Sequence, residues 1–276
     1  MADAAYADPG ALPSLGIGSI LSRAFSILGK RFPLLFGLVF AVQLVFVAIS
    51  LATPALSAPA FVDPATGAFN VAALGPLALY TLVFAIVYAV IQGVVTVAAY
   101  DTATGRPSRV GDYFGAVFRN IVPLVVVSIL SAVAVYVGLI LLIVPGLWVA
   151  AVLSVVIPAV VIDAAGFDAF GRSARLTKEY RWPIVGLLVI VFVIVFGISL
   201  ALGAALVAIV GVTGAVEATN VAAAGVTTGV IVFQLINAAI GAVTYAFLAV
   251  AIALLFARLK EIKEGLGFED LSNVFD

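Results

Sequence analysis

Five long stretches of this sequence contain no charged residue, and this feature limits the fold more than any other. A helix needs about 20 apolar residues to cross the hydrocarbon core of a bilayer, and each stretch can supply at least one such helix. The chain is 65% hydrophobic, whereas soluble domains are about 45–50% apolar. We therefore predict an all-α polytopic membrane protein. The uncharged stretches cover residues 32–62, 64–100, 120–162, 182–216 and 218–257.

The uncharged stretches predict six transmembrane helices. The third stretch is too long for one crossing, and Pro145-Gly146 is its expected break because Pro ends a helix and Gly tolerates a turn. Charge counting leaves an alternative open, since a re-entrant hairpin over 121–162 returns the chain to the same side as a double crossing. We favour the double crossing. The six helices are predicted over 32–52, 71–99, 121–144, 147–162, 183–211 and 227–257.

The Lys and Arg residues predict how the chain is threaded. All 13 lie before the first span, after the last span or in two of the loops, and the intervening loops hold none. The positive-inside rule then places both termini and the two basic loops in the cytoplasm. We predict a multi-pass protein of a bacterial inner membrane, with a disordered tail over 1–13, a membrane domain over 14–257 and a cytoplasmic tail over 258–276.

Three charged segments that precede spans are predicted to form amphipathic surface helices. Segments 17–33 and 110–123 carry apolar residues at helical i, i+3, i+4, i+7 spacing. All three segments end in an apolar residue followed by Pro, which suits the first turn of a helix. The third segment, 167–183, has a weaker apolar face made of Phe167, Phe170, Ala174 and Thr177, and its predicted ion pairs are Asp168–Arg172 and Arg175–Glu179.

The same three segments predict an internal repeat. One surface helix followed by two spans occurs three times, over 17–99, 110–162 and 167–257. Each unit begins and ends on the same side of the membrane, so the three units are expected to be parallel repeats.

The residue types that are present exclude most catalytic chemistry. The chain has no Cys and no His, which removes thiol nucleophiles, imidazole bases and most zinc ligand sets. No charged residue lies within a predicted span, so proton or cation coupling in the membrane is not indicated. The net charge of −1 argues against a nucleic-acid partner. We predict a protein that is not an enzyme and that has no cofactor or metal.

Two groups of residues are candidate sites. The basic loop before the fifth span is predicted to contact anionic lipid headgroups or a membrane protein partner, and the alternative is that it only anchors the topology. A polar face of the sixth span, supported by the amides of Gln43 and Gln92 in the first two spans, predicts either hydrogen bonds between helices or a polar pathway. The basic group is Arg172, Arg175, Lys178, Arg181 and Trp182, and the polar face is Gln234, Asn237 and Thr244.

Several short motifs between residues 145 and 189 carry a family resemblance. They are Pro145-Gly146, Pro158, Arg172-Ser173, Leu176-Thr177-Lys178 and Trp182. With them, the chain resembles the membrane domain attached to some bacterial glycerophosphoryl diester phosphodiesterases and related six-span inner-membrane proteins of unknown function. The N-terminal ILSRAFSILGKRFPLLF is similar to that family's opening surface helix. The resemblance implies a membrane domain only, because the phosphodiesterase activity belongs to a separate barrel that needs histidines and metal-binding acids.

Together these features predict a non-catalytic accessory or scaffold protein that engages lipid or a membrane partner. The alternative is a permease or lipid transporter that uses the polar face of the sixth span.

Overall fold

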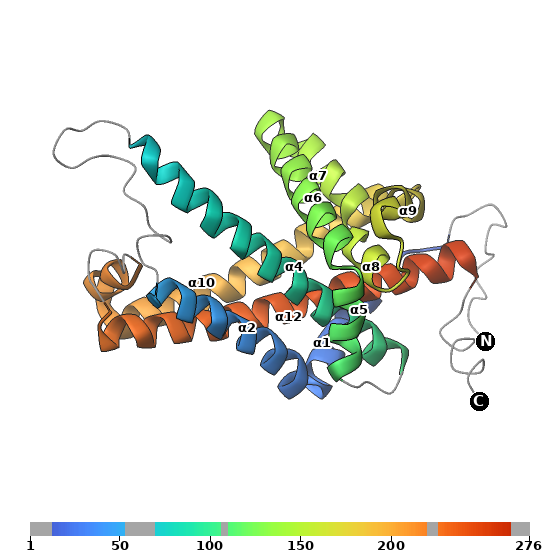
Figure 1. Cartoon of the computed structure of the whole chain (residues 1–276). Coiled ribbons are helices and arrows are strands. Elements are labelled where there is room, and N and C mark those ends of the chain that lie inside the picture. The colour runs from blue at the N-terminus through green and yellow to red at the C-terminus, as the bar shows by residue number, and fades with distance from the viewer. Residues whose placement is uncertain (1–12, 53–69, 106–109, 220–225, 266–276) are drawn as a thin grey trace, which may run out of the picture.

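The computed structural model describes residues 13–52, 70–105, 110–219 and 226–265, and within these ranges the chain is helical and has no strand (Figure 1). Six helices are long and apolar enough to cross a membrane, which confirms the predicted all-α polytopic class. The elements are α1 (Ile17–Lys30), α2 (Phe32–Ala52), η1 (Val71–Ala73), α4 (Leu74–Thr104), α5 (Val110–Arg119), α6 (Ile121–Leu141), α7 (Ile143–Leu153), α8 (Val156–Val161), η2 (Gly166–Asp168), α9 (Ala169–Thr177), α10 (Arg181–Thr219) and α12 (Thr228–Glu264).

Parts of the prediction lie outside the described residues. They include nearly all of the 1–13 tail, the loop over 53–69, Arg106 and Arg109, and residues 266–276.

The first helical turns agree with the sequence pattern. Pro33, Pro123 and Pro183 all lie within the first three residues of α2, α6 and α10, where a missing amide proton costs no hydrogen bond. Thr227, the first residue of the predicted sixth span, is the N-cap of α12, and its Oγ1 accepts a hydrogen bond from the amide of Val230 at 3.2 Å.

Two spans continue as unbroken helices beyond their predicted ends, whereas α10, predicted to end at residue 211, continues to Thr219 only across a kink at Gly211. α4 runs to Thr104 and is buried as far as Tyr100, whose ring lies 6.1 Å from that of Phe256. α12 runs to Glu264 and stops at Gly265, which adopts a left-handed conformation. The end predicted at residue 257 is therefore wrong, and residues 258–264 are the last two turns of the sixth helix. They are helical because Leu259 is fully buried and the charged residues around it are paired.

The break in the third uncharged stretch lies at Leu142 and not at Pro145-Gly146. Leu142 is extended, and Pro145 and Gly146 lie in the first turn of α7. The predicted fourth helix is itself split into α7 and α8 at Ser154–Val155. Pro158 explains this second break, since it has no amide proton to donate to the carbonyl of Ser154, four residues earlier.

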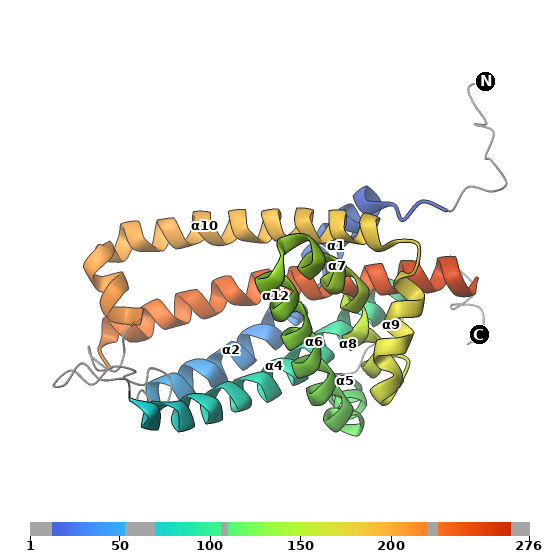
Figure 2. The same cartoon turned by 90° about the horizontal axis from the view of Figure 1, so that it is seen from above.

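Four long helices set the main direction of the molecule. α10 and α12 lie side by side, α2 and α4 form a second pair, and α12 contacts both pairs (Figures 1 and 2). The short helices α1, α5 and α9 gather toward the end where α10 begins and α12 ends. The α6–α7 hairpin differs from the other pairs, because it runs across α10 and α12 in both views.

A surface helix followed by two apolar helices therefore occurs three times in the chain order. The apolar helices of the middle unit, α6 and α7, run in a different direction from those of the other two units. The repeat stays a prediction, since it requires a superposition of the units.

The core is concentrated at the end of the molecule that carries the short helices. Small residues on α4 and α12 let the helices approach closely there. At Gly93, an added Cβ would lie 2.9 Å from Val117 Cγ2 and 3.1 Å from Leu124 Cδ2, so α4 meets α5 and α6 only because Gly93 has no side chain.

Candidate functional site

The surface helix α9 is fixed to the hairpin through buried hydroxyl groups. Ser173 Oγ donates a hydrogen bond of 2.6 Å to the carbonyl of Val152 in α7, and Thr177 Oγ1 donates to the carbonyl of Ser173 at 2.9 Å. The buried face of α9 is Ala169, Ser173, Leu176 and Thr177.

The predicted apolar face of the third surface helix is thus wrong for Phe167, whereas Thr177 is buried and Phe170 packs against the core. Phe167 lies in η2, before the helix begins, and is 61% exposed, while Phe170 and Ala174 are half-buried. The apolar pattern misled the prediction because Ser173 and Thr177 can be buried once their hydroxyl groups are hydrogen-bonded.

Asp163, just after α8, joins two cations from distant parts of the chain. It accepts hydrogen bonds from Arg172 Nε and from Lys260 Nζ, both at 2.8 Å. Arg172 and Lys260 also pair with Glu264 at the end of α12. We call Asp163, Arg172, Lys260 and Glu264 the ion-pair network. Their side chains are 13–25% exposed, so water screens these contacts only in part.

The ion-pair network keeps Arg172 charged. Partial burial acts against its charge, but hydrogen bonds to Asp163 and Glu264 outweigh burial and raise its pKa. The predicted pair Asp168–Arg172 is therefore wrong. Asp168 instead pairs with Arg175 at 3.0 Å, in a contact that is more than 60% exposed.

A second set of contacts fixes the turn between α9 and α10. Glu179 accepts a hydrogen bond from Lys263 Nζ at 2.5 Å, which corrects the predicted Arg175–Glu179 pair. The bond to the Lys263 ammonium lowers the pKa of Glu179. Lys263 also lies 5.5 Å above the ring of Tyr180, whose hydroxyl donates to the carbonyl of Pro13 at 2.8 Å. The turn, the end of α12 and the start of the described chain are thereby joined.

The five residues of the predicted basic surface have different roles. Arg172 belongs to the ion-pair network, and the guanidinium of Arg181 lies 4.5 Å above the ring of Trp148 in α7. Arg175, Lys178 and Trp182 remain exposed. Two of the five positions therefore hold the fold together, and three are accessible to a partner or to lipid.

The predicted polar residues of the sixth span do not come together around a cavity. Asn237 is exposed and donates to the carbonyl of Phe233 at 3.1 Å, within its own helix. Gln234 is half-buried, and Thr244 Oγ1 is buried without a hydrogen-bond partner in the described part of the chain.

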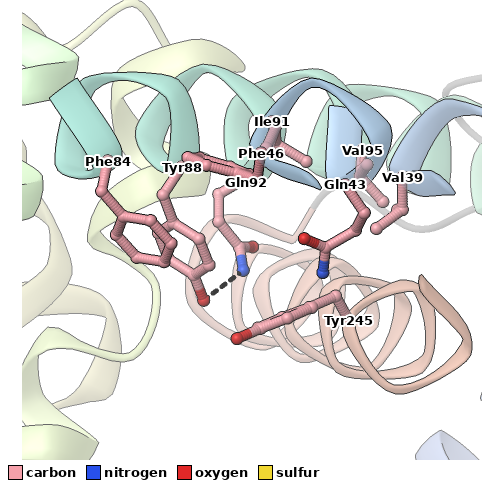
Figure 3. A pocket seen from close by; sticks show the side chains of 9 residues that line it. All are labelled: Val39, Gln43, Phe46, Phe84, Tyr88, Ile91, Gln92, Val95 and Tyr245. Atoms are coloured by element: carbon pink, nitrogen blue, oxygen red, sulfur yellow. Dashed lines mark hydrogen bonds between the residues drawn. The ribbon is translucent and has the colours of Figure 1, made fainter. Parts of the chain in front are cut away.

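A polar cavity lies instead between α2, α4 and α12. Gln43, Tyr88, Gln92 and Tyr245 point toward one another across it (Figure 3), and Gln92 Nε2 donates to the Tyr88 hydroxyl at 2.8 Å. The space is about 20 Å³, enough for about one water molecule. The remaining lining residues are Val39, Phe46, Phe84, Ile91 and Val95.

Gly241 makes room for the amide of Gln43 in this cavity. A Cβ at Gly241 would lie 2.7 Å from Gln43 Nε2. The sequence predicts polar contacts for Gln43 and Gln92, the amides within spans, and the structure adds Tyr88 and Tyr245 to them. For Tyr88 the sequence holds a signal, because Tyr88 and Gln92 lie four residues apart and so share one face of α4.

The cavity between α2, α4 and α12 contains neutral polar groups, and the ion-pair network contains paired charges. Among the described residues, no group of three or more acidic side chains is placed to hold a metal ion. Comparisons with protein-family models, with curated proteins and with solved structures each find no match to this chain. The resemblance noted at residues 145–189 therefore stays a prediction.

Proposed function

We propose that this protein is a non-catalytic scaffold of the bacterial inner membrane, and that one end of it binds anionic lipid headgroups. This end, where α9 lies, α10 begins and α12 ends, is called the basic end. One observation supports this most: Arg175, Lys178 and Trp182 are exposed on a segment that is fixed at other positions. Ser173 is bonded to α7, and Arg172 and Glu179 are bonded to α12. A segment held in one conformation loses little entropy on binding, which favours a headgroup site. Trp is the residue type that favours the headgroup level of a bilayer.

The proposal places both termini and the basic loops on the cytoplasmic side. Anionic lipids of that leaflet attract basic residues by about 1 kcal/mol per Lys or Arg near the surface. The same exposed residues could bind a membrane protein partner with an acidic face. In that case the protein would have the predicted accessory role.

The test replaces exposed charges and leaves the ion-pair network intact. Arg175→Gln/Lys178→Gln is expected to retain less phosphatidylglycerol than the unaltered protein in native mass spectrometry from mixed phosphatidylglycerol–phosphatidylcholine nanodiscs. The matched control is Lys30→Gln/Arg31→Gln, an equal charge change at two exposed residues, the last of α1 and the one that joins α1 to α2. Equal loss in both variants would indicate general electrostatic attraction and would contradict a site on the α9–α10 turn.

A second candidate function is the movement of lipid across the membrane, and the observation behind it is the group of polar side chains that meet between α2, α4 and α12 around a space for about one water molecule. Lipid scrambling in proteoliposomes, followed by dithionite bleaching of a fluorescent headgroup, measures it directly. Gln92→Leu removes the Tyr88 contact and is expected to lower scrambling if the cavity is on the lipid path. Proteoliposomes that scramble no faster than empty vesicles would exclude this function.

A further inference from the structure

The α6–α7 hairpin carries the largest run of exposed apolar side chains in the described chain, at its tip. From Ile140 to Val144 every side chain is apolar and 61–83% exposed. A turn that emerged in water on the far side of a membrane would leave this surface in contact with water, at about 25 cal/mol for each Å² of apolar area. The tip is therefore suited to hydrocarbon.

The backbone of the tip is also suited to hydrocarbon, where each unpaired polar group costs several kcal/mol. The amide of Leu142 donates to the carbonyl of Gly138 at 3.0 Å, and the carbonyl of Leu142 accepts from the amide of Gly146 at 3.1 Å. Pro145 has no amide proton to satisfy. At this turn, the two hydrogen bonds and the proline therefore reduce the number of unpaired backbone groups that two helix ends would otherwise leave.

Two contacts place the hairpin at the level of the basic end. Val152 lies ten residues beyond the turn at Leu142, or about 15 Å along the helix. If the turn lay at the far side of a bilayer about 30 Å thick, Val152 would lie near the middle of that bilayer. Its carbonyl instead accepts a bond from the short side chain of Ser173 in the charged helix α9.

Trp148 gives a second measure of depth. It lies six residues from the turn, so in a double crossing it would lie about 20 Å from the basic side. Its ring instead contacts Arg181, the first residue of α10. The direction of the hairpin, which runs across α10 and α12 in Figures 1 and 2, agrees with both contacts.

We infer that the α6–α7 hairpin is a lateral arm that inserts its apolar tip among the acyl chains of the leaflet next to the basic loops. The hairpin enters and leaves on that side, and the chain crosses the membrane through α2, α4, α10 and α12. This inference stands independently of the headgroup site, because it rests on the tip and its depth alone.

The chain has no native Cys, so single cysteines can report the position of the tip. Leu142→Cys and Ile140→Cys, each carrying a nitroxide and reconstituted in vesicles, are expected to show strong contact with oxygen and weak contact with a water-soluble nickel complex. Matched controls are Ser57→Cys in the loop predicted on the far side and Lys178→Cys at the basic end, where the nickel complex is expected to reach the label.

The possible results distinguish whether acyl chains, water or protein surround the tip. Nickel contact at both tip labels, from either side of the vesicle, would place the tip in water and overturn the inference. Weak contact with both oxygen and nickel would place protein over the tip, such as a second copy of the chain, and would also overturn it. A membrane-impermeant maleimide can also be applied to the Leu142→Cys variant before the nitroxide is attached. Labelling as fast as that of Ser57→Cys would place the tip on the far side and would support the double crossing instead.

Discussion

At the scale of single residues, Asp163 connects more of the molecule than any local pattern suggests. It follows the apolar helix α8 in sequence, yet it binds Arg172 of α9 and Lys260 of α12. Partly buried charges are costly unless they are paired, so removing one carboxylate leaves two cations competing for Glu264. The exposed pair Asp168–Arg175 uses the same residue types and has no such consequence.

We predict that Asp163→Asn lowers the free energy of unfolding by about 1–3 kcal/mol, because it leaves charged donors without an acceptor. Asp168→Asn is the matched control and is expected to cost less than about 1 kcal/mol, as exposed pairs do. Thermal unfolding in detergent compares the two midpoints. Equal shifts would show that the burial of the ion-pair network has no energetic effect.

Glycine positions give a second prediction at this scale. Gly93→Ala gains about 1 kcal/mol in helix propensity but forces Val117 and Leu124 outward, an overpacking cost of about 1–3 kcal/mol. Gly197→Ala gains the same propensity and meets no atom within 4 Å. The control should therefore be more stable than Gly93→Ala by about 1–3 kcal/mol in the same unfolding experiment. A Gly93→Ala variant as stable as the control would mean that α5 and α6 can move away from α4 freely.

At the scale of elements, α9 is a surface helix whose buried face is partly polar. Its hydroxyl groups replace apolar side chains because Val152 offers a carbonyl at the break between α7 and α8. The break made by Pro158 and the burial of Ser173 are thus one arrangement. The helix depends on hydrogen bonds as well as on apolar contact.

We predict that Ser173→Ala loosens α9 and costs about 1 kcal/mol, the usual net value of one hydrogen bond. Hydrogen exchange of residues 169–177, measured by mass spectrometry, should become faster while exchange in α10 stays unchanged. Ser22→Ala is the control, because Ser22 is an exposed surface-helix serine that bonds only within its own helix. Unchanged exchange in α9 would mean that Leu176 and Ala169 hold the helix without the hydroxyl.

The α9–α10 turn is expected to respond to acid. Because the pKa of Glu179 is lowered in the folded protein, its contact with Lys263 contributes stability above the ordinary glutamate pKa of about 4.3, and this stability is lost as pH falls through the lowered value. Fluorescence of Trp182, three residues away, should therefore change only below about pH 4. Glu179→Gln should abolish the change. A transition in the Gln variant at the same pH would assign it to another group.

At the scale of the whole molecule, the last two turns of α12 hold the basic end together. They supply Lys260, Lys263 and Glu264 to partners on α9 and in the loops beside it, and Arg258 donates to the carbonyl of Ser14 at 3.1 Å. Segments from both ends of the described chain and from its middle meet there. A membrane domain that ended at residue 257 would lack these contacts.

Truncation tests this arrangement. A chain that ends after Ala257 is expected to expose α9, so that trypsin cuts at Arg172, Arg175 or Lys178 much faster than in the full chain. A chain that ends after Gly265 keeps every contact named here and should be cut at the full-length rate. Equal protection in the two truncated chains would show that α9 is held by α7 alone.

The sequence by itself determined the class of this protein and much of its helix content. Each transmembrane helix can be located from its own uncharged stretch, since a bilayer imposes a fixed length on each helix. The predicted bounds of the first span are those of α2. The proline start signals are equally local, because Pro33, Pro123 and Pro183 each act on the first turn of their own helix.

The tertiary structure decided which polar residues meet. Asp163 with Lys260, Ser173 with Val152, and Gln43 with Gly241 are contacts between helices far apart in sequence, and helical periodicity shows only which side of one helix a residue lies on. The same limit applies to the α6–α7 hairpin. Its composition suits a span or an arm equally, and its direction became visible only from the helices it crosses.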